Sequence, residues 1–317
     1  MENRYVIGID VGGTKTAYGV FDENKQIIKE RREPSDASLT AEAFFDGIIA
    51  AVDTLCAECG ITRAQLAGIG IGVPSFIRWE DGFLINTPTL PNIREFPATE
   101  YMTARLGGVP VLFDNDGRTA ALAEHRNGAG RGFTNMIYCP VSTGISSAIV
   151  INNAAFRGSY GFAGESGHAL ATPGEGIQCG CGQQGCYMSY CSGAMIVRHI
   201  QNWIAAGDAT IMAELAGGAS KITTVHIGAA YSKGDAMAQR AVEQMARYLA
   251  TWLFNLYMTL NINCFVLGGG LLKMNAPLLA RIREIFDGYN QNDYPVYFKE
   301  AELGDACGII GAAELFF

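Results

Sequence analysis

The segment YVIGIDVGGTKTAYGVF, Tyr5–Phe21, combines two apolar runs with a turn of small residues between them. The first run, Tyr5–Ile9, is rich in β-branched side chains, and the second run returns at Ala17–Phe21. Glycines in the turn permit a tight reversal of the chain. We therefore predict two strands joined by a hairpin turn.

The same arrangement returns in the middle of the chain. Met136–Val141 predicts a strand, Ser142-Thr143-Gly144 a turn, and Ser146–Ile151 a returning strand. A repeated plan of this kind indicates two structurally duplicated halves.

Apolar periodicity predicts the remaining elements. Helices are expected at about 40–59, 117–126, 194–205, 225–230, 235–260, 276–286 and 304–317, and strands at 26–29, 67–72, 109–113, 264–267 and 296–298. The run Gly68-x-Gly70-x-Gly72 lies within a strand and is followed by Pro74. It is therefore not the dinucleotide-binding signature, in which a helix must open directly after the glycines.

The composition bounds the class of protein. The 317 residues carry a net charge of −8 without a basic run, so no nucleic-acid partner is expected. The first residues lack the charged and apolar regions of a secretory signal. The longest apolar stretch, 248–260, is interrupted by polar residues, so no membrane span is expected. Nine cysteines without a secretory signal favour a reducing, cytoplasmic location and metal binding over disulfides.

The segment GESGHALATPGEGIQCGCGQQGCYMSYCSG, Gly164–Gly193, has the spacing of a metal site. His168 is followed by Cys179-x-Cys181 and then by Cys186. Three thiolates and one imidazole complete a tetrahedral, structural Zn²⁺ site. Glycines between the cysteines let the backbone turn so that the sulfur atoms can meet. The alternative is a loop with unpaired or disulfide-bonded cysteines.

The first hairpin turn has the residues of a phosphate site. Gly12 and Gly13 expose backbone N–H groups, and Thr14 and Lys15 add a hydroxyl and an ammonium group. Asp10, at the end of the first strand, can hold Mg²⁺ through water. The alternative is an ordinary hairpin turn without a ligand.

Two further turns follow predicted strands in the same way. In the second hairpin, Thr143 and Gly144 suit another phosphate contact. The triplet Gly268, Gly269 and Gly270 follows a buried strand directly and permits close approach of an adenosine or its phosphates. Three such turns after three strands indicate a nucleotide site more strongly than any one of them.

The order of motifs resembles that of the ROK family (repressors, open reading frames and sugar kinases). The motifs are D-x-G-G-T, N-D, S-T-G, E-x-G-H, C-x-C-G-x-x-G-C and L-G-G-G, and the resemblance runs from Val6 to Ala313. It implies an α/β fold of two ribonuclease-H-like, actin-like ATPase domains with a cleft between them and a zinc-binding loop. It also implies ATP binding, phosphorylation of a sugar hydroxyl and a homodimer. The expected domains are 1–117 with the terminal helix at about 303–317, and 118–302 with the zinc motif.

The same resemblance assigns the sugar site. Asn115 and Asp116 match the sugar-binding Asn and the catalytic Asp, which accepts the proton of the attacking hydroxyl as a general base. Glu165 matches a Glu that binds sugar hydroxyls. His168 matches a residue that binds zinc through one nitrogen and the sugar through the other. For Asp116 the alternative is the N-cap of the helix that follows.

This chain departs from the family pattern at three places. Met188 stands where the family commonly has a sugar-binding Glu two residues after the last zinc Cys. The second phosphate turn, Ser142–Ser147, contains serines where glycines are usual. Arg118 replaces a small residue or Asn two residues after the base.

Three substrates are compatible with the motifs: D-allose, glucose and fructose. The runs Thr87–Pro91 and Cys191–Gly193, and Met274 after the glycine triplet, are similar to allose kinases. Because Met188 lacks a charge, a sugar-binding protein with weakened catalysis is the alternative to a kinase. The repressor branch of the family carries a helix-turn-helix before the first Gly-Gly-Thr. Since the first strand is expected to begin at Tyr5, no such segment is expected here.

Overall fold

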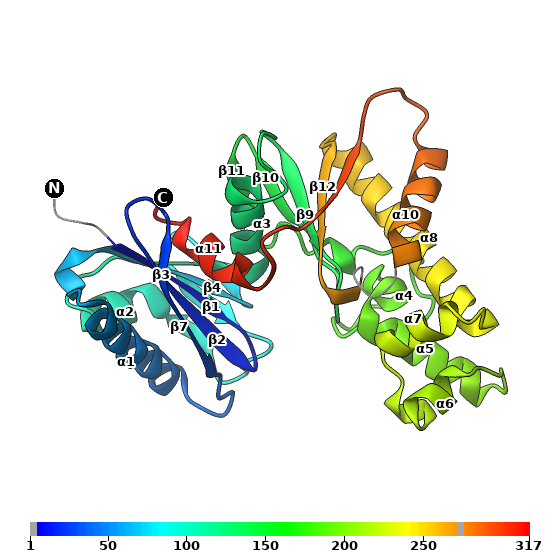
Figure 1. Cartoon of the computed structure of the whole chain (residues 1–317), viewed down its shortest axis with the longest axis horizontal. Coiled ribbons are helices and arrows are strands. Elements are labelled where there is room, and N and C mark those ends of the chain that lie inside the picture. Colours follow the sequence, from blue (N-terminus) through cyan, green and yellow to red (C-terminus); the bar gives the residue numbers. More distant parts are fainter. Residues whose placement is uncertain (1–4, 272–275) are drawn as a thin grey trace. The chain divides into compact units, whose positions relative to one another are not determined.

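The computed structural model describes residues 5–271 and 276–317 (Figure 1). The chain forms two compact units, and the expected α/β class is confirmed. Unit 1 comprises Met1–Thr134, Ala148–Ala163 and Ala301–Phe317, and unit 2 comprises Asn135–Ser147 and Gly164–Glu300. The domain boundaries near residues 117 and 303 that the resemblance implies remain a prediction.

Unit 1 is built on a five-stranded sheet of order β3-β2-β1-β4-β8. The strands are β1 (Tyr5–Val11), β2 (Lys15–Phe21), β3 (Ile27–Pro34), β4 (Leu66–Val73) and β8 (Val111–Asn115). The first three strands are antiparallel neighbours, which confirms the predicted hairpin, and β1, β4 and β8 are parallel. The carboxyl ends of these parallel strands therefore meet at one edge of the sheet.

One face of this sheet packs against α1 (Ala41–Cys59) and α2 (Ala98–Arg105), and buries residues such as Ile7 and Ile9 in their common core. Helix α1 begins after Thr40, whose side-chain oxygen accepts the N–H of Ala43, and it ends at Gly60 in the left-handed conformation. These are the cap residues that stop a helix at both ends.

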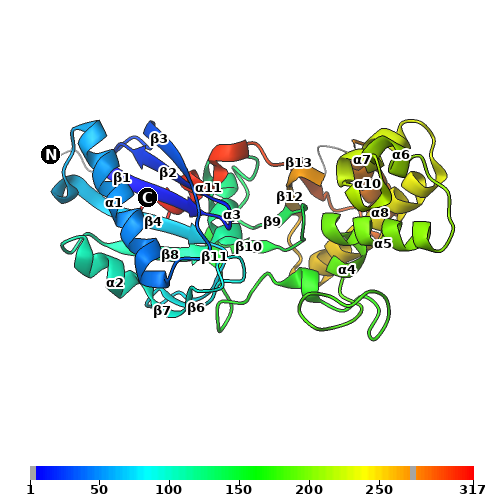
Figure 2. The same cartoon turned by 90° about the horizontal axis from the view of Figure 1, so that it is seen from below.

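The other face of the sheet packs against α11 (Cys307–Ala313), which lies beside α3 (Asp116–Asn127) (Figure 2). The contact is too close for side chains on the strands. A Cβ atom on Gly8 would lie 2.0 Å from the Ile309 carbonyl oxygen, and one on Gly70 would lie 1.8 Å from that of Ala312. Of the alternating glycines at 68–72, Gly70 thus makes room for α11. The other two make room for the Phe316 ring and the Thr119 side chain, and none of the three is needed for a nucleotide.

Three strands that lie together in unit 1 are among the elements that the sequence pattern did not predict. They are β5 (Phe76–Arg78), β6 (Phe83–Asn86) and β7 (Arg94–Pro97), which form a small antiparallel sheet. The terminal segment also differs from the single helix predicted for 304–317, because α11 ends at Ala313. Short strands give too few alternating positions for the sequence pattern to show.

Unit 2 repeats the parallel part of the plan. Strand β12 (Cys264–Gly268) lies parallel to both β9 (Met136–Pro140) and β13 (Tyr297–Glu300). An antiparallel hairpin of β10 (Ala148–Ile151) and β11 (Ala154–Phe156) follows β9 in sequence, as β2 and β3 follow β1, and it is grouped with unit 1. The strand order along the chain thus supports the predicted duplication.

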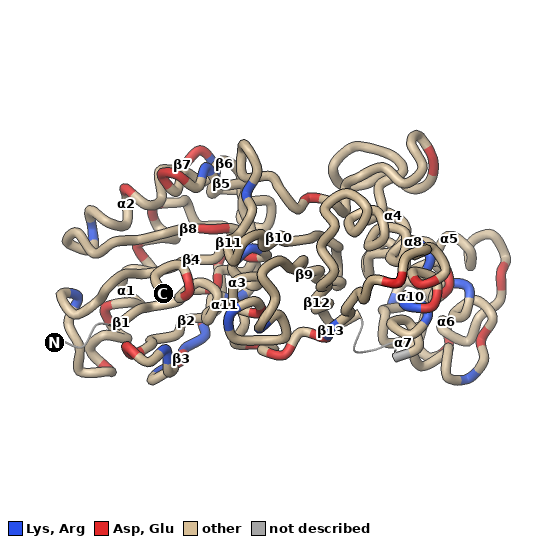
Figure 3. Tube along the Cα trace, turned by 90° about the horizontal axis from the view of Figure 1, so that it is seen from above, with Lys and Arg blue, Asp and Glu red and all other residues tan. Residues whose placement is uncertain are grey.

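Helices make up most of the rest of unit 2. They are α4 (Met188–Cys191), α5 (Gly193–Ala205), α6 (Met212–Ala216), α7 (Thr224–Tyr231), α8 (Ala236–Leu260) and α10 (Ala276–Tyr289). Within the described ranges, no helix has the length and apolarity needed to cross a membrane. Acidic and basic positions are scattered over both units (Figure 3).

Candidate functional site

Three predicted site residues lie at the same edge of the sheet in unit 1. Asp10 pairs with Gly72 near the end of β1, and Asn115 pairs with Val73 at the end of β8. Asp116 follows directly as the first residue of α3. The parallel strands therefore bring the predicted Mg²⁺ residue and the predicted base to one edge, although they are far apart in the sequence.

The two aspartates at this edge are electrostatically coupled. Burial and, second, the negative charge of Asp116 raise the pKa of Asp10 to about 6. Burial also raises the pKa of Asp116, and the nearby guanidinium group of Arg118 opposes this shift. A carboxylate with a raised pKa is a stronger base than an exposed one, which suits proton abstraction.

The helix cap in this region is Asn115 rather than Asp116. The Asn115 Oδ1 atom accepts the N–H of Gly117 at 3.0 Å, and its amide donates to the Ser75 carbonyl oxygen at 3.4 Å. Asp116 Oδ1 also accepts the Gly117 N–H, at 2.9 Å. The capping alternative that we considered for Asp116 therefore belongs mainly to its neighbour.

The first predicted phosphate turn closes as a tight hairpin. Gly12 donates its N–H to the Lys15 carbonyl oxygen at 2.8 Å, and the side chains of Thr14 and Lys15 are exposed. A Cβ atom on Gly13 would lie 2.9 Å from Cβ of Thr89. The turn thus packs against the 87–91 segment, a contact that sequence spacing did not reveal.

A cavity of about 300 Å³ in unit 2 brings the other two predicted turns together. Thr143 and Gly270 line it, with Ser142 and residues from the start of α5 and from the 222–224 segment. The Ser142 carbonyl oxygen accepts the N–H of Gly193 at 2.8 Å, which attaches the turn to the start of α5. Its lining combines hydroxyl-bearing residues such as Thr143 and Thr224 with apolar ones such as Val197. Such a mixed lining suits a small-molecule ligand.

The other two glycines of the triplet pack closely against neighbouring parts of the protein. Gly269 has a φ of +96°, and a Cβ there would lie 2.3 Å from the Val141 carbonyl oxygen. A Cβ on Gly268 would lie 2.6 Å from the Tyr138 hydroxyl. The triplet therefore permits close packing within unit 2, and Gly270 is its member that faces the cavity. Met274 lies outside the described residues.

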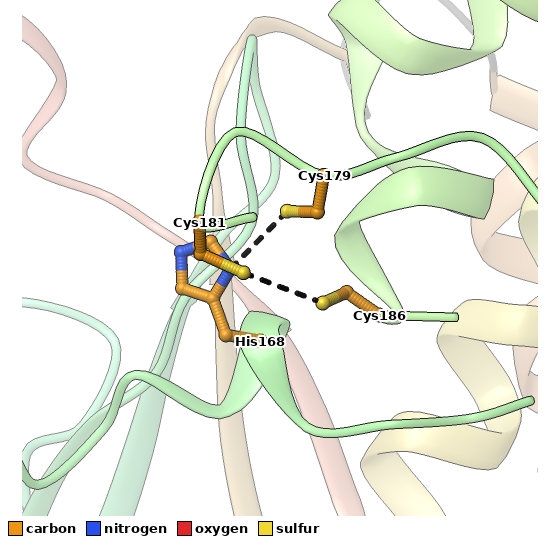
Figure 4. A group of neighbouring side chains, drawn as sticks. All are labelled: His168, Cys179, Cys181 and Cys186. Carbon is orange, nitrogen blue, oxygen red and sulfur yellow. Dashed lines mark hydrogen bonds between the residues drawn. The ribbon is translucent and has the colours of Figure 1, made fainter. Parts of the chain in front are cut away.

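The four predicted zinc ligands converge (Figure 4). The ligand atoms of His168, Cys179, Cys181 and Cys186 all lie within 4.8 Å of one another. Nδ1 of His168 is 3.4 Å from Sγ of Cys179, and Sγ of Cys181 is 3.6 Å from Sγ of Cys186. The edge of a tetrahedron with Zn–S bonds is about 3.8 Å, so the donor set fits zinc.

Two glycines shape the loop that carries the cysteines. Gly182 and Gly185 have φ values of +90° and +93°, and a Cβ on Gly185 would lie 1.9 Å from the Thr172 carbonyl oxygen. Burial and the neighbouring thiols raise the pKa of Cys186 to about 12. A bound Zn²⁺ reverses this preference, because it stabilises thiolates.

The Glu165–His168 segment is attached to the second phosphate turn by hydroxyl groups. Ser166 Oγ is 2.8 Å from Ser147 Oγ and accepts the indole N–H of Trp252 at 3.0 Å. A Cβ on Gly167 would lie 2.2 Å from the Ile145 carbonyl oxygen. The segment with the predicted sugar ligands and the turn with the serines are therefore one packed substructure.

Met188 occupies the start of α4, next to the second phosphate turn. Its terminal methyl carbon lies 3.6 Å from the position of a Cβ on Gly144. An apolar thioether thus lies where the family pattern has a carboxylate, and it packs near the turn.

Comparisons with known proteins identify the family. The chain matches the ROK family over residues 6–317. It is 33% identical over 315 residues to the glucokinase of Streptomyces coelicolor (98% of this chain, 96% of the relative). It is 32% identical over 310 residues to the N-acetylmannosamine kinase of Shigella flexneri (98% and 97%). The chain belongs to the ROK family, and the expectation of a sugar kinase is confirmed at the level of enzyme class.

Solved structures agree with this assignment. The ROK hexokinase of Thermus thermophilus superposes with a TM-score of 0.83 at 30% identity, over 98% of this chain and 96% of that one. The ROK family glucokinase of Streptomyces griseus, solved in complex with glucose and AMPPNP, gives 0.78 at 31% identity, over 98% of each chain.

The metal cluster gives a first prediction. Purified, freshly reduced protein should contain about one zinc per chain, and Cys181→Ser should lose both the zinc and thermal stability, because metal binding contributes to folding. Cys59→Ser, at a cysteine of α1 outside the cluster, is the matched control and should retain the metal. Mass spectrometry measures the zinc content of the wild-type protein and of both variants. Zinc-free wild-type protein would contradict the assignment.

The coupled aspartates give a second prediction. Because the pKa of Asp10 is raised from the ordinary 3.8 of an aspartate to about 6 in the folded protein, its ionisation destabilises the folded state as the pH rises from about 4 to above 6. In Mg²⁺-free buffer at pH 8, Asp10→Asn should therefore raise the free energy of unfolding by up to about 3 kcal/mol. Urea unfolding at pH 8 and pH 4 measures this. The difference should vanish at pH 4, and an equal difference at both pH values would exclude a charge effect.

Proposed function

We propose that this ROK-family chain transfers the γ-phosphoryl group of ATP to a hydroxyl group of a hexose, with Asp116 as the general base. The observation that carries the proposal is the half-buried Asp116 at the strand edge, whose pKa is raised, next to the cap residue Asn115. Support comes from the ATP analogue and glucose in the Streptomyces griseus relative.

Substrate binding is assigned to two groups of residues. In unit 1, Asn115 offers an amide to hydroxyl groups and Asp116 accepts the proton of the attacking hydroxyl. In unit 2, Glu165 and His168 bind further hydroxyls. Zinc on His168 Nδ1 would fix the tautomer of the imidazole so that its other nitrogen is available to the sugar.

Nucleotide binding is assigned to the three turns. The backbone N–H of Gly13 and the exposed groups of Thr14 and Lys15 contact phosphate oxygens. Gly12, whose N–H is bonded to the Lys15 carbonyl oxygen, holds the turn closed. The cavity lined by Thr143 and Gly270 accommodates the nucleoside side of ATP. Asp10 would hold Mg²⁺ through water, and the ion would neutralise charge on the phosphates during transfer. Gly144, Gly268 and Gly269 shape these turns.

The sequence of events follows from these roles. The sugar hydroxyl loses its proton to Asp116 while its oxygen forms the new bond to the γ-phosphorus, and the bond to the β-γ bridging oxygen breaks in line. Lys15 and the turn N–H groups stabilise negative charge on the phosphates.

We further propose that the protein forms a homodimer, and that its sugar substrate is D-allose, glucose or fructose.

The base gives a third prediction. Asp116→Asn should preserve the fold and approximate sugar binding, yet reduce kcat by roughly 10²–10⁴, which is the usual contribution of a general base. A coupled assay of ADP release across a panel of hexoses measures it. A variant with nearly full turnover would contradict the role of Asp116. No turnover by wild type with any hexose, together with sugar binding, would favour the weakened sugar-binding alternative.

Met188 gives a fourth prediction. A carboxylate opposite a sugar hydroxyl is worth about 1.5–3 kcal/mol of binding, so Met188→Glu should improve kcat/KM for glucose relative to the native substrate. Met258→Glu, at an exposed methionine of α8, is the matched control and should change nothing. If wild type already has a low KM for glucose and Met188→Glu has no effect, this position does not contact the sugar.

A further inference from the structure

A buried carboxylate lies directly before the predicted sugar-binding pair. Asp114 is fully buried and forms ion pairs with two guanidinium groups. Arg118 Nε donates to its Oδ1 at 2.6 Å, and Arg157 donates to its Oδ2 from Nε at 2.9 Å and from Nη2 at 2.7 Å. Asp114 Oδ1 also accepts the N–H of Asn115 at 2.8 Å. One carboxylate thus holds the end of β8, the first turn of α3 and the segment at 157.

Arg118 makes a second connection that Arg157 does not make. Its Nη1 donates to the Gly161 carbonyl oxygen at 2.9 Å. Gly161 is itself fixed on β5, because it has a φ of +76° and a Cβ there would lie 2.4 Å from the Ile77 carbonyl oxygen. The rings of Phe162 and Phe76 pack edge to face, 5.0 Å apart. The guanidinium group therefore joins the first turn of α3 to a loop that the small sheet holds in place.

Burial of the Arg118 side chain is energetically unfavourable unless the residue has a role beyond packing. Its side chain is 4% exposed, and Nη2 has no hydrogen-bond partner among the described residues. A buried donor without a partner opposes folding. The Arg118 charge also favours the ionised form of Asp116, since it lowers the Asp116 pKa against the larger effect of burial. Both observations favour a functional role.

We propose that Arg118 is a positioning residue for the base: its guanidinium group, held by Asp114, fixes the first turn of α3 against the loop at Gly161. Asp116 lies in this turn, so its carboxylate is held in one place relative to the end of β8. The proposal rests on the proposed function of Asp116. Arg118 itself needs no contact with the reacting atoms.

The test compares kcat with KM in variants of the full-length enzyme. Arg118→Met leaves Asp114 paired with Arg157, so the protein should fold. We expect kcat to fall about 10- to 100-fold, the usual effect of a displaced catalytic group, while KM for ATP stays unchanged. Arg118→Lys keeps the charge but cannot hold both Asp114 and Gly161, so its kcat should lie between those of wild type and Arg118→Met.

Arg157→Gln is the matched control, because it breaks the other ion pair of Asp114 and leaves the link to Gly161. It should retain nearly wild-type kcat. The proposal is overturned if Arg118→Met keeps wild-type kcat, if Arg157→Gln loses as much, or if KM for ATP rises in parallel with the loss of kcat. Should Arg118→Met fail to fold, Arg118→Lys decides: a wild-type kcat overturns the proposal, and an intermediate one supports it.

Failure of this inference can be distinguished from failure of the proposed function. Full activity of Arg118→Met together with an inactive Asp116→Asn removes only the role of Arg118. An active Asp116→Asn removes the base itself, and the role of Arg118 with it.

Discussion

The architecture of unit 1 depends on the contact between α11 and the central strands of its sheet. Gly8 of β1 and Gly70 of β4 leave no side chain between strand and helix, so backbone packs on backbone. A side chain at Gly8 or Gly70 would have to displace the helix. This contact brings the end of the chain to the beginning of the chain. It also brings Gly308 so close to Asp10 that a Cβ would lie 2.3 Å from the carboxyl carbon.

Partial burial of the Asp10 carboxylate is a consequence of that packing. The Asp10 carboxylate is shielded from water on the side covered by α11, and the negative charge of Asp116 repels it. Both effects disfavour the ionised form, so the pKa of Asp10 rises to about 6. Two acids held together in this way oppose folding at neutral pH. They are at the same time suited to hold a cation and to accept a proton, which is what phosphoryl transfer requires.

Unit 2 is organised around its cysteine cluster in a comparable way. The loop from 169 to 187 has few regular elements, and its shape depends on left-handed glycines and on the convergence of three thiols with His168. Through Ser166 and Ser147 the same segment is bonded to the second phosphate turn. A metal there would therefore stabilise the turn as well as the loop. Met188 packs beside Gly144 at the end of this substructure.

The sequence by itself determined those features that arise from local patterns. Apolar runs on either side of Gly12 and Gly13 defined the first hairpin, and helical periodicity over about 40–59 defined α1, because both depend on neighbours in the chain. The spacing of His168 and the three cysteines likewise predicted a zinc site, because these residue types are zinc ligands. The small sheet of β5, β6 and β7 was not predicted, since its strands are too short to show an alternating pattern.

Only the tertiary structure decided which distant residues meet. The parallel arrangement of β1, β4 and β8 brought Asp10 to the same edge of the sheet as Asn115 and Asp116. Packing of α11 supplied the burial that shifts the Asp10 pKa. The pairing of Asp114 with Arg118 and Arg157, and the contact of Gly13 with Thr89, had no signal in the spacing of the sequence. Such contacts depend on sheet order and on the direction of side chains, which neither composition nor periodicity specifies.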